Sequence, residues 1–347
     1  MSTLRLIGFF CGLIVLLITF YRLRFPAEKR TNIWLLIGFA VILMLVSLFP
    51  GVVNLPADLI SLGDQKGGRL ITLLLISSAL LWFFILYERG KNDARYFQFD
   101  QWARNTTVKE FLESYPKDFE EGTIFILIPA YNEAENLEQV LPKIPRRINE
   151  KPVNRLIIDD GSTDATCRVA QKQDAMVAVQ RSNRGGGAAL KVGYEIIKKI
   201  SPAVVVTMDA DGQHAPEAIQ SLVEPILENE ADFIIGSRII GTHEIDSSLR
   251  FYGVRVFSKM INILLGTHIT DCSSGFRAFN KTILDDCLLL EEQYHTAELI
   301  IEAAKKGYRI EERPIHIAKR LSGKSKKGKD FKYALFFFRT ILKSWFR

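Results

Sequence analysis

Three long apolar runs occupy the first quarter of the chain. They span Leu4–Tyr21, with Arg5 near the edge, Ile33–Phe49 and Leu70–Tyr87. Each has close to the ~20 residues that a helix needs to cross a hydrocarbon core of ~30 Å. A secretory signal peptide would explain the first run alone, but Tyr21–Phe25 offers no small-residue cleavage site and two more runs follow. The pattern predicts a membrane domain over residues 1–90 with three transmembrane helices, about 4–21, 33–49 and 70–87.

The charges of the connecting loops predict how these helices are oriented. The loop after the first run carries Arg22, Arg24, Lys29 and Arg30, and the positive-inside rule places such a loop in the cytoplasm. Three crossings return the chain to that side after Tyr87. We therefore expect a multi-pass protein of the cell membrane whose large carboxyl-terminal part is cytoplasmic. Residues 91–122 are charged and aromatic without a clear period, which indicates a connector.

From residue 123 onward, short β-branched runs alternate with amphipathic stretches. The expected strands are Thr123–Pro129, Arg155–Asp159, Met176–Gln180, Ala203–Asp209 and Asp232–Ser237. Helical patterns fall between them at Glu135–Ile148, Asp164–Gln173, Gly187–Ile200 and Pro216–Asn229. This alternation predicts an α/β domain over residues 123–327, with a mostly parallel sheet and helices on both faces.

Polar clusters follow four of the expected strands. They are Tyr131–Glu133, Asp159–Asp164, Asp209–Gln213 and Gly236–Arg238. One such cluster would be explained by a turn with a helix cap. Ligands of open α/β sheets bind outside the carboxyl ends of the strands, so four clusters at these ends indicate a binding site.

The cluster after the fourth strand has the pattern of a metal site. Asp209 and Asp211 flank the small residue Ala210, and Gln213 follows with an amide oxygen. Carboxylate and amide oxygens suit Mg²⁺ or Mn²⁺, which commonly keep phosphate oxygens as further ligands. A lone Asp-x-Asp also occurs as a helix cap, and its position after an apolar strand is what favours the metal.

Basic side chains to complete a diphosphate site are also present. Arg238 follows the fifth strand, and Arg320, Lys324 and Lys326 lie in a Gly/Ser-rich loop, where charge toward a membrane surface is an equal alternative. The glycines of Gly185–Gly187 open a helix and suit phosphate, but their spacing is not that of a dinucleotide fingerprint.

The end of the chain is strongly basic and aromatic. Residues 319–347 carry ten basic side chains against the single acid Asp330, whereas the whole chain has a formal charge of +6. Aromatic residues interleaved with this charge suit an anionic membrane surface better than nucleic acid. We expect residues 328–347 to form a helix that lies in the interface, because Lys332, Arg339 and Lys343 interrupt the apolar run.

Four cysteines, Cys11, Cys167, Cys272 and Cys287, lack the spacing of a zinc site. We expect free thiols, with Cys272 as a small buried residue.

An ordered set of motifs resembles a known family. The motifs are Ile128-Pro-Ala-Tyr-Asn-Glu133, Ile158-Asp-Asp-Gly-Ser162, Asn183-Arg-Gly-Gly-Gly187, Met208-Asp-Ala-Asp-Gly-Gln-His214, Gly236-Ser-Arg238, Ser274-Gly-Phe-Arg277, Ala297-Glu298 and Arg320-x-x-Gly-Lys-Ser-Lys326. Over about residues 124–327 they resemble the family 2 glycosyltransferases of the GT-A fold, in the branch of dolichol-phosphate mannose synthases and polyprenyl-phosphate sugar transferases.

The resemblance implies roles for individual residues. Those that would hold the nucleoside are Pro129, Tyr131, Glu133, Ile158 and Asp160, with the Ala210 backbone close by. The metal ligands would be Asp209, Asp211 and Gln213, and the groups on diphosphate or acceptor phosphate would be Arg238, Arg320 and Lys326. Asp211 and Arg238 would be catalytic.

Other charged residues have weaker claims. Arg250, Arg255 and Lys259 on a helical stretch are weaker candidates for the acceptor phosphate, and solvated helix charges are the alternative. Glu298 would either orient a sugar hydroxyl or cap a helix from a buried position.

The implied reaction is inverting, metal-dependent transfer of a hexose, mannose or glucose foremost, to a polyprenyl phosphate at the cytoplasmic membrane face. The donor would be GDP-mannose or UDP-glucose, and the acceptor dolichyl or undecaprenyl phosphate. The alternatives are a processive polysaccharide synthase, whose Q-x-x-R-W signature and later membrane spans are missing from the sequence, and a noncatalytic membrane scaffold. The oligomeric state stays open, a homo-oligomer included.

Overall fold

The computed structural model describes residues 3–22, 30–54, 58, 68–115, 119–244, 248–291, 294–320 and 330–347. The chain divides into two compact units, Met1–Phe97 and Gln98–Arg347.

The first unit contains a close pair of apolar helices, α1 (Thr3–Arg22) and α2 (Arg30–Leu48). They meet where α1 carries glycine: a Cβ added to Gly12 would lie 2.7 Å from Met44 Cγ and 3.0 Å from the Ala40 carbonyl oxygen. Small residues permit this approach of two backbones, as between membrane helices. The Thr19 hydroxyl donates to the Val15 carbonyl oxygen over 2.7 Å, so this polar group is satisfied inside its own helix.

A short 3₁₀ turn, η1 (Pro50–Val53), follows α2, and the third apolar run lies in α4 (Gly68–Ser114). Within the described residues, Leu70–Ser114 is long and apolar enough to cross a membrane, by length and composition. The apolar stretches Arg5–Tyr21 and Leu36–Leu48 are helical but shorter. Helices thus form at all three apolar runs, and three crossings remain a prediction.

The expected connector, residues 91–122, differs from the structure, because α4 continues as one helix to Ser114. In this part of the helix, oppositely charged side chains one turn apart form pairs, and no regular apolar stripe is present in the sequence. Lys91 Nζ lies 3.2 Å from Glu88 Oε1, and Lys109 Nζ lies 3.8 Å from Glu113 Oε1. Such pairs support a helix without giving it a hydrophobic stripe, which is why the hydrophobic pattern missed it.

The second unit is built on a twisted sheet. In the described part of the chain its eight strands are β1 (Ile124–Ala130), β2 (Arg147–Ile148), β3 (Lys151–Asp159), β4 (Met176–Val179), β5 (Val204–Thr207), β6 (Phe233–His243), β7 (Arg277–Asn280) and β8 (Ile310–Ile317). The order is β2-β3-β1-β5-β7-β6-β8, and β4 pairs with β3. All five expected strands are present, and β2, β7 and β8 are additional.

The pairing brings the ends of four strands to one edge. Strand β1 runs parallel to β3 and β5, and β3 runs parallel to β4. Strand β7 is antiparallel to both β5 and β6, so β6 points the same way as β5. The carboxyl ends of β1, β3, β5 and the first part of β6 therefore share one edge of the sheet.

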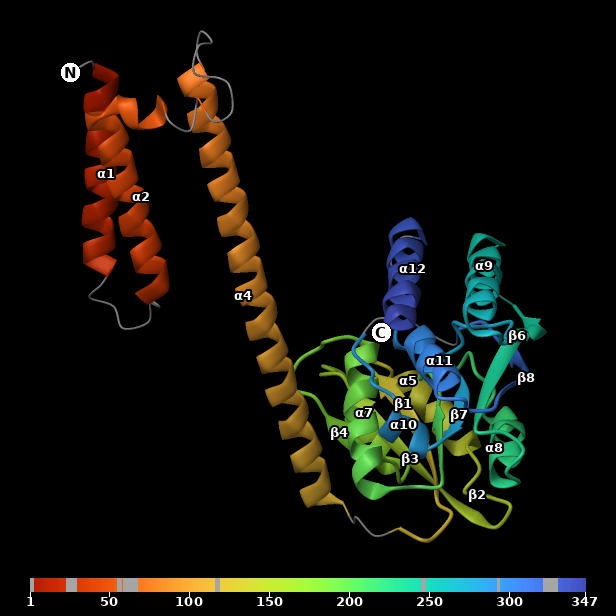
Figure 1. Ribbon diagram of the computed structural model, residues 1–347. Helices are drawn as coiled ribbons and strands as arrows, with labels where there is room; N and C mark the ends of the chain where they lie inside the picture. Colours follow the sequence, from red (N-terminus) through yellow and green to blue (C-terminus); the bar gives the residue numbers. More distant parts are fainter. Residues whose placement is uncertain are drawn as a thin grey trace. The chain divides into compact units, whose positions relative to one another are not determined.

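Helices cover both faces of this sheet (Figure 1). One face is packed by α7 (Gly186–Ile200), α9 (Ser248–Leu265), α10 (Thr282–Asp286), α11 (His295–Lys305) and α12 (Asp330–Phe346). The other is packed by α5 (Ala134–Val140), α6 (Thr166–Lys172) and α8 (Ile219–Leu227), which follows a 3₁₀ turn, η3 (Pro216–Ala218). Strand β1 serves both cores, since Phe125 and Leu127 face the first and Ile126 and Ile128 the second.

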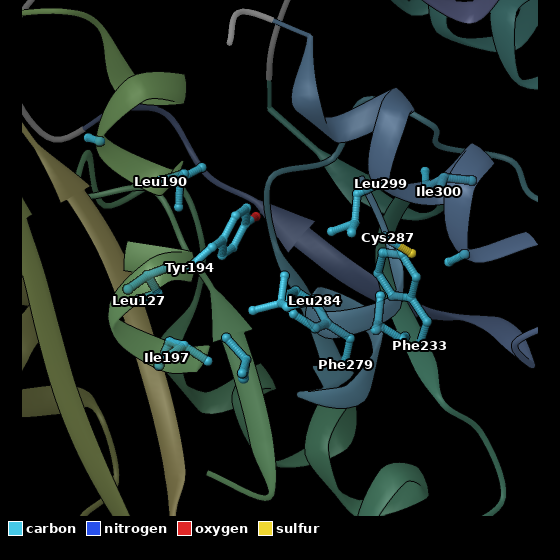
Figure 2. Packing of buried hydrophobic residues seen from close by; sticks show 14 of the residues in the cluster. Leu127, Leu190, Tyr194, Ile197, Phe233, Phe279, Leu284, Cys287, Leu299 and Ile300 are labelled. Carbon is cyan, nitrogen blue, oxygen red and sulfur yellow. The ribbon is translucent and has the colours of Figure 1, made fainter. Parts of the chain in front are cut away.

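Aromatic and aliphatic side chains from distant segments fill the first core. Figure 2 shows Leu127, Tyr194, Phe233 and Phe279 among them. The rings of Phe233 and Phe279 lie 5.6 Å apart edge to face, on neighbouring strands. This packing fixes β6 and β7 against α7 and α11.

The helix expected over Glu135–Ile148 is shorter. It ends at Val140, passes through a 3₁₀ turn, η2 (Leu141–Lys143), and reaches strand β2. Pro142 lies in that turn, and Ile144, which precedes Pro145, is extended with ψ 123°. Proline disfavours the helical conformation in the residue before it. The helix therefore ends earlier than the apolar pattern of the sequence.

The carboxyl-terminal segment forms α12, as expected, but one face of this helix belongs to the second unit. Phe337 and Ile341 are buried in the first core, and the Phe337 ring meets those of Phe257 and Tyr294. Lys343 Nζ lies 2.6 Å from Glu291 Oε1. On other sides of the helix, large side chains such as Leu335 and Phe346 are exposed.

Leu127→Ala tests the importance of the β1–α7 contact. Leu127 is fully buried, and a Cβ added to Gly193 of α7 would lie 2.6 Å from its methyl carbons. We expect a loss of ~2–5 kcal/mol in the free energy of unfolding, because the cavity cannot collapse against a rigid strand. Ile240→Ala, on β6 at 49% exposure, is the control and should change it by about 0.5 kcal/mol or less. Equal losses in chemical denaturation of the two variants would contradict this packing.

Candidate active site

A cleft of about 690 Å³ lies at the carboxyl edge of the sheet in the second unit. Its walls come from the segments that follow β1, β3, β4 and β5, from Arg238 and His243 of β6, and from α9, the loop before β7, the start of α11 and the end of β8. The lining residues include Pro129, Tyr131, Glu133, Asp160, Asn183–Gly187, Asp209, Ala210, Asp211, Gln213, Arg238, Ser273–Gly275, His295, Thr296 and Arg320. The four predicted clusters therefore meet in one site.

The segment after β5 is a tight turn held by its own polar groups. The Asp209 backbone N–H donates to His214 Nδ1 over 3.2 Å, and the Gln213 N–H donates to Asp211 Oδ1 over 3.1 Å. The His214 ring stacks on Phe276 at 4.9 Å. Gly212 has φ +73°, a conformation that glycine adopts without strain. His214 therefore supports the turn by binding its backbone and stacking on Phe276.

The two carboxylates of this turn have different neighbours. Asp211 Oδ2 lies 2.7 Å from Nη2 of Arg320, and Nη1 of the same guanidinium lies 3.6 Å from Glu133 Oε1. The Asp209 carboxylate lies above Gly275, where an added Cβ would be 3.2 Å from Oδ1. A guanidinium therefore already sits where acidic oxygens converge, so this position favours positive charge.

Asp209, Asp211 and Gln213 carry side-chain oxygen atoms, which are chemically suited to bind a divalent ion. Among the described residues there is no group of three or more His, Cys, Asp or Glu side chains placed to hold a metal. The predicted set has two carboxylates and an amide, oxygen ligands of the kind that Mg²⁺ and Mn²⁺ prefer, with remaining positions for phosphate or water. The Gln213 amide nitrogen donates to the Ala318 carbonyl oxygen over 3.2 Å, which orients the amide.

Arg238 is held rigidly at the rim of the cleft. Its Nε lies 2.8 Å from Asp271 Oδ2 and its Nη2 lies 3.1 Å from Asp271 Oδ1, while Nη2 also donates to the Ser273 hydroxyl. The Asp271 side chain is fully buried. A two-point pair of this kind fixes the plane of the guanidinium. The sequence pointed to Arg238 but not to Asp271 as its partner.

Asp160 organises the glycine loop that follows β4. Its Oδ1 accepts the Arg184 N–H over 2.9 Å and its Oδ2 accepts the Gly185 N–H over 2.7 Å. Burial raises the pKa of the Asp160 carboxyl, and the hydrogen bonds from Arg184 and Gly185 oppose that rise. Gly185 has φ +94°, so the loop depends on glycine at this position.

Of the remaining predicted site residues, one lies away from the cleft and one is outside the described part of the chain. Ile158 of β3 is fully buried in the first core and does not line the cleft. Its side chain points to the core face of the sheet, because successive side chains of a strand point to opposite faces. Lys326, like Lys324, lies outside the described residues. The role implied for each by the resemblance is untested.

Two of the weaker candidates, Glu298 and Arg255, contact other groups of the protein. Glu298 is fully buried, accepts the N–H groups of Leu290 and Glu291 over 2.9 and 2.8 Å, and lies 3.0 Å from Arg347 Nη1. Glu298 is thus buried as expected, but it holds the backbone of Leu290 and Glu291 and does not cap α11, whose N-cap residue is Tyr294. The Arg255 guanidinium lies 4.7 Å from the centroid of the Phe251 ring, whereas Lys259 is exposed away from the cleft. Nothing is described of the Arg250 side chain.

Cys272 is buried, and burial raises the pKa of its thiol to about 12, which suits a packing role. Its N–H donates to the Ser258 hydroxyl over 3.0 Å. Arg277, fully buried below the same loop, donates to the carbonyl oxygens of Cys272, Ser274 and Thr296. These bonds tie the floor of the cleft to the start of α11, a link invisible in the sequence.

Known proteins match the second unit. The sequence profile described as "Glycosyl transferase family 2" matches residues 125–288. Polyprenol monophosphomannose synthase of Mycolicibacterium smegmatis is 31% identical over 228 residues, which cover 61% of this chain and 83% of that protein. UDP-N-acetylglucosamine–dolichyl-phosphate N-acetylglucosaminyltransferase of Methanococcus voltae is 29% identical over 214 residues, covering 55% and 84%.

A solved structure shares the fold. Glucosyl-3-phosphoglycerate synthase from Mycobacterium tuberculosis, in complex with Mn²⁺, uridine diphosphate and glucosyl-3-phosphoglycerate, superposes with a TM-score of 0.51 at 20% identity. The match covers 64% of this chain and 79% of that one. The second unit therefore has the GT-A fold.

Gly275→Ala tests the environment of Asp209. The added methyl group would press on the Asp209 carboxylate, which would have to move by a few tenths of an ångström. If Asp209 ligates a divalent ion, Mn²⁺ affinity measured by electron paramagnetic resonance should fall by about 10-fold, as when a group supporting a ligand is altered. Gly253→Ala, where the new Cβ meets nothing within 4 Å, is the control. Unchanged Mn²⁺ binding by Gly275→Ala would remove Asp209 from the ligand set.

Proposed function

The chain belongs to glycosyl transferase family 2 and is a glycosyltransferase, and on that premise we propose that it transfers a hexose from a nucleotide-diphospho-sugar to a polyprenyl phosphate, with inversion at the anomeric carbon. Mannose or glucose is the favoured sugar, carried by GDP or UDP, and the lipid is dolichyl or undecaprenyl phosphate. Relatives named as transferases to polyprenol or dolichyl phosphate support this acceptor class.

The observation that carries the proposal is the mixed charge of the cleft. Asp209 and Asp211 lie at the carboxyl end of β5, and the guanidinium groups of Arg238 and Arg320 line the same cleft. A cleft lined by acids alone would repel a diphosphate. A cleft lined by cations alone could bind a diphosphate without a metal ion. The combination suits a diphosphate that arrives with a divalent ion.

On the donor side, the residues proposed to hold the nucleoside are Pro129, Tyr131, Glu133 and Asp160, with the Ala210 backbone and Ile158 beneath. We propose Asp209, Asp211 and Gln213 as ligands of Mg²⁺ or Mn²⁺. The ion would neutralise the charge that develops on the departing diphosphate.

Arg238 and Arg320 would hold the phosphate groups, with Lys326 assigned to the same task from its motif. Because Asp271 holds Arg238 at two points, its charge is already in place when the sugar leaves, and no reorganisation is required. Arg320 would exchange the carboxylate of Asp211 for a phosphate oxygen when the donor enters.

The acceptor supplies its own nucleophile. A phosphate monoester loses its second proton with a pKa of about 6, so an oxygen is ionised at neutral pH without a general base. Alignment of that oxygen with the anomeric carbon then accounts for most of the catalysis. The walls from α9 and α11 would face this acceptor, since Phe251, Val254 and Thr296 line the cleft.

We propose that the membrane domain brings the cleft to the lipid headgroups. It would cross the bilayer three times within residues 1–90, and the GT-A domain of residues 123–327 would lie on the cytoplasmic side. Residues 328–347, in α12, would contact the interface through exposed side chains such as Leu335 and Phe346.

A product assay tests the function. Purified protein in lipid nanodiscs, given radiolabelled GDP-mannose, UDP-glucose or UDP-N-acetylglucosamine with polyprenyl phosphate and Mn²⁺, should yield a chloroform-extractable lipid with one sugar. Asp211→Asn should lower the rate at least ~100-fold, because charge stabilisation in the transition state is the largest expected contribution. Asp174→Asn, on a surface pair with Arg146, should retain wild-type activity. Polymer as the product, or full activity of Asp211→Asn, would sink the proposal.

Fusion reporters test the topology. Green fluorescent protein joined after Arg347 through a flexible linker should fluoresce, because three crossings leave that end in the cytoplasm. Alkaline phosphatase at the same place should be inactive, and it should become active when fused after Phe49. The reverse pattern would overturn the orientation.

A further inference from the structure

The last third of α4 is part of the GT-A unit, although the same helix begins with an apolar membrane run. The second unit starts at Gln98, and α4 continues to Ser114. Val108 and Phe111 are buried in the first core of the sheet. The Tyr115 hydroxyl accepts the Val177 N–H of strand β4 over 3.1 Å. This part of the helix is therefore fixed beside β4 and the loop that follows it.

One buried ion pair joins this helix to that loop. Asp100 of α4 accepts a hydrogen bond from Arg184 Nη1 on its carboxylate, and the same nitrogen donates to the Asp100 carbonyl oxygen over 3.2 Å. The side chains of Arg184 and Asp100 are 7% and 6% exposed. Arg104, one turn along α4, pairs with the same carboxylate. A buried charge of this kind is costly unless it is paired, so the contact strongly constrains both partners.

The pair continues into the donor side of the cleft. Arg184 Nε donates to Gln180 Oε1 over 3.1 Å, and Gln180 Nε2 donates to Asp160 Oδ1 over 3.0 Å. The backbone N–H groups of Arg184 and Gly185 also end on Asp160. Asp100, Arg184, Gln180 and Asp160 thus form one connected network, within the second unit, from the last part of α4 to the loop that follows β4.

The segment of residues 183–187 leads directly into α7, whose first residues are Gly186 and Gly187. It lines the cleft over Asn183–Gly187, and Gly185 and Gly186 have nothing within 4 Å of the place where a Cβ would be. Its three consecutive glycines provide no side chains for packing. Its end is fixed by α7, where the Ala189 N–H donates to the Gly185 carbonyl oxygen over 3.1 Å. Before the helix, it is held by the bonds to Asp160 and by the anchored Arg184 guanidinium.

We propose that Asp100 is a positioning residue for the nucleotide-sugar: by holding Arg184, it fixes the loop 183–187 in the shape that receives the donor. The inference rests on the proposed function for the identity of the ligand. Asp100 lies before residue 125, where the match to the family profile begins, so this support comes from the chain's own membrane-linked helix. Donor binding is then coupled to the seating of α4 on the GT-A unit.

The test uses full-length protein in nanodiscs and compares Asp100→Asn, Arg184→Gln and the double variant. Asp100→Asn should raise the KM for nucleotide-sugar, and the Kd for GDP or UDP with Mn²⁺, by about 10-fold, with kcat changed less than about 2-fold. The double variant should bind no more weakly than Arg184→Gln, because Asp100 acts through Arg184. Asp100→Glu, which keeps the charge, should recover part of the affinity.

The matched control is Glu110→Gln. Glu110 of α4 lies 2.6 Å from Arg181, which flanks the same loop, but these side chains are 46% and 79% exposed and the pair is outside the Asp160 network. Glu110→Gln should leave the KM unchanged. A KM increase equal to that of Asp100→Asn would mean that any α4–loop contact suffices and would overturn the specific role of Asp100.

Hydrogen–deuterium exchange of ligand-free protein gives a readout independent of activity. Residues 181–187 should exchange about 10-fold faster in Asp100→Asn than in wild type or Glu110→Gln, while β1 and β5 stay protected. If Asp100→Asn fails to fold, Arg184→Gln, which removes the other charge of the same pair, carries the same comparison. Unchanged loop exchange, or wild-type nucleotide affinity in the charge-deleted variant, overturns the inference. A wild-type protein that binds no nucleotide would refute the proposed function, while the exchange result would still decide whether Asp100 orders the loop.

Discussion

The need of several buried carboxylates at the carboxyl edge of the sheet for positively charged or N–H partners is the constraint on which the rest of the second unit depends. Parallel strands bring Asp160 and Asp209 to one edge, and the adjoining turns add Asp211 and Asp271. Carboxylates that are removed from water need partners, or their charge is costly. Each partner here comes from a different segment: Arg320 for Asp211, Arg238 for Asp271, and loop N–H groups for Asp160.

These partners explain the architecture of the loops. Arg238 follows the first part of β6, and Arg320 follows β8, so both cations reach the cleft from the half of the sheet beyond β5. The antiparallel strand β7 separates β5 from β6, and its first residue, Arg277, carries a buried guanidinium that holds three carbonyl oxygens of the floor. Burial lowers the pKa of Arg277 to about 10, still far above neutral pH, so it stays charged. Carboxylates thus hold the two cations of the cleft, and backbone carbonyl oxygens hold the buried Arg277 beneath it.

The helix α4 connects two environments through one continuous backbone. Its first part has the composition of a membrane span, and its last part packs on the GT-A unit through Val108 and Phe111. Charged pairs along the helix satisfy its polar middle without an apolar stripe.

The sequence by itself determined the alternation of strands and helices and the motif order, because both depend on local periodicity and on short spacings. The five strands, α6, α7 and the acidic turn after β5 were therefore predictable, as was the membership in the family. Strands β7 and β8 were not, because a short antiparallel strand is stabilised by neighbours far along the chain, as Arg277–Asn280 is by β5 and β6.

Tertiary structure alone decided which charges are partners. The carboxylate of Asp271 meets Arg238, 33 residues away in the chain, and that of Asp100 meets Arg184, 84 residues away. Spacing along a sequence carries no information about such contacts, since they depend on how sheets and helices pack. It also decided that Ile158 faces the core and that Glu298 holds a loop, because burial of a side chain is set by the surfaces around it.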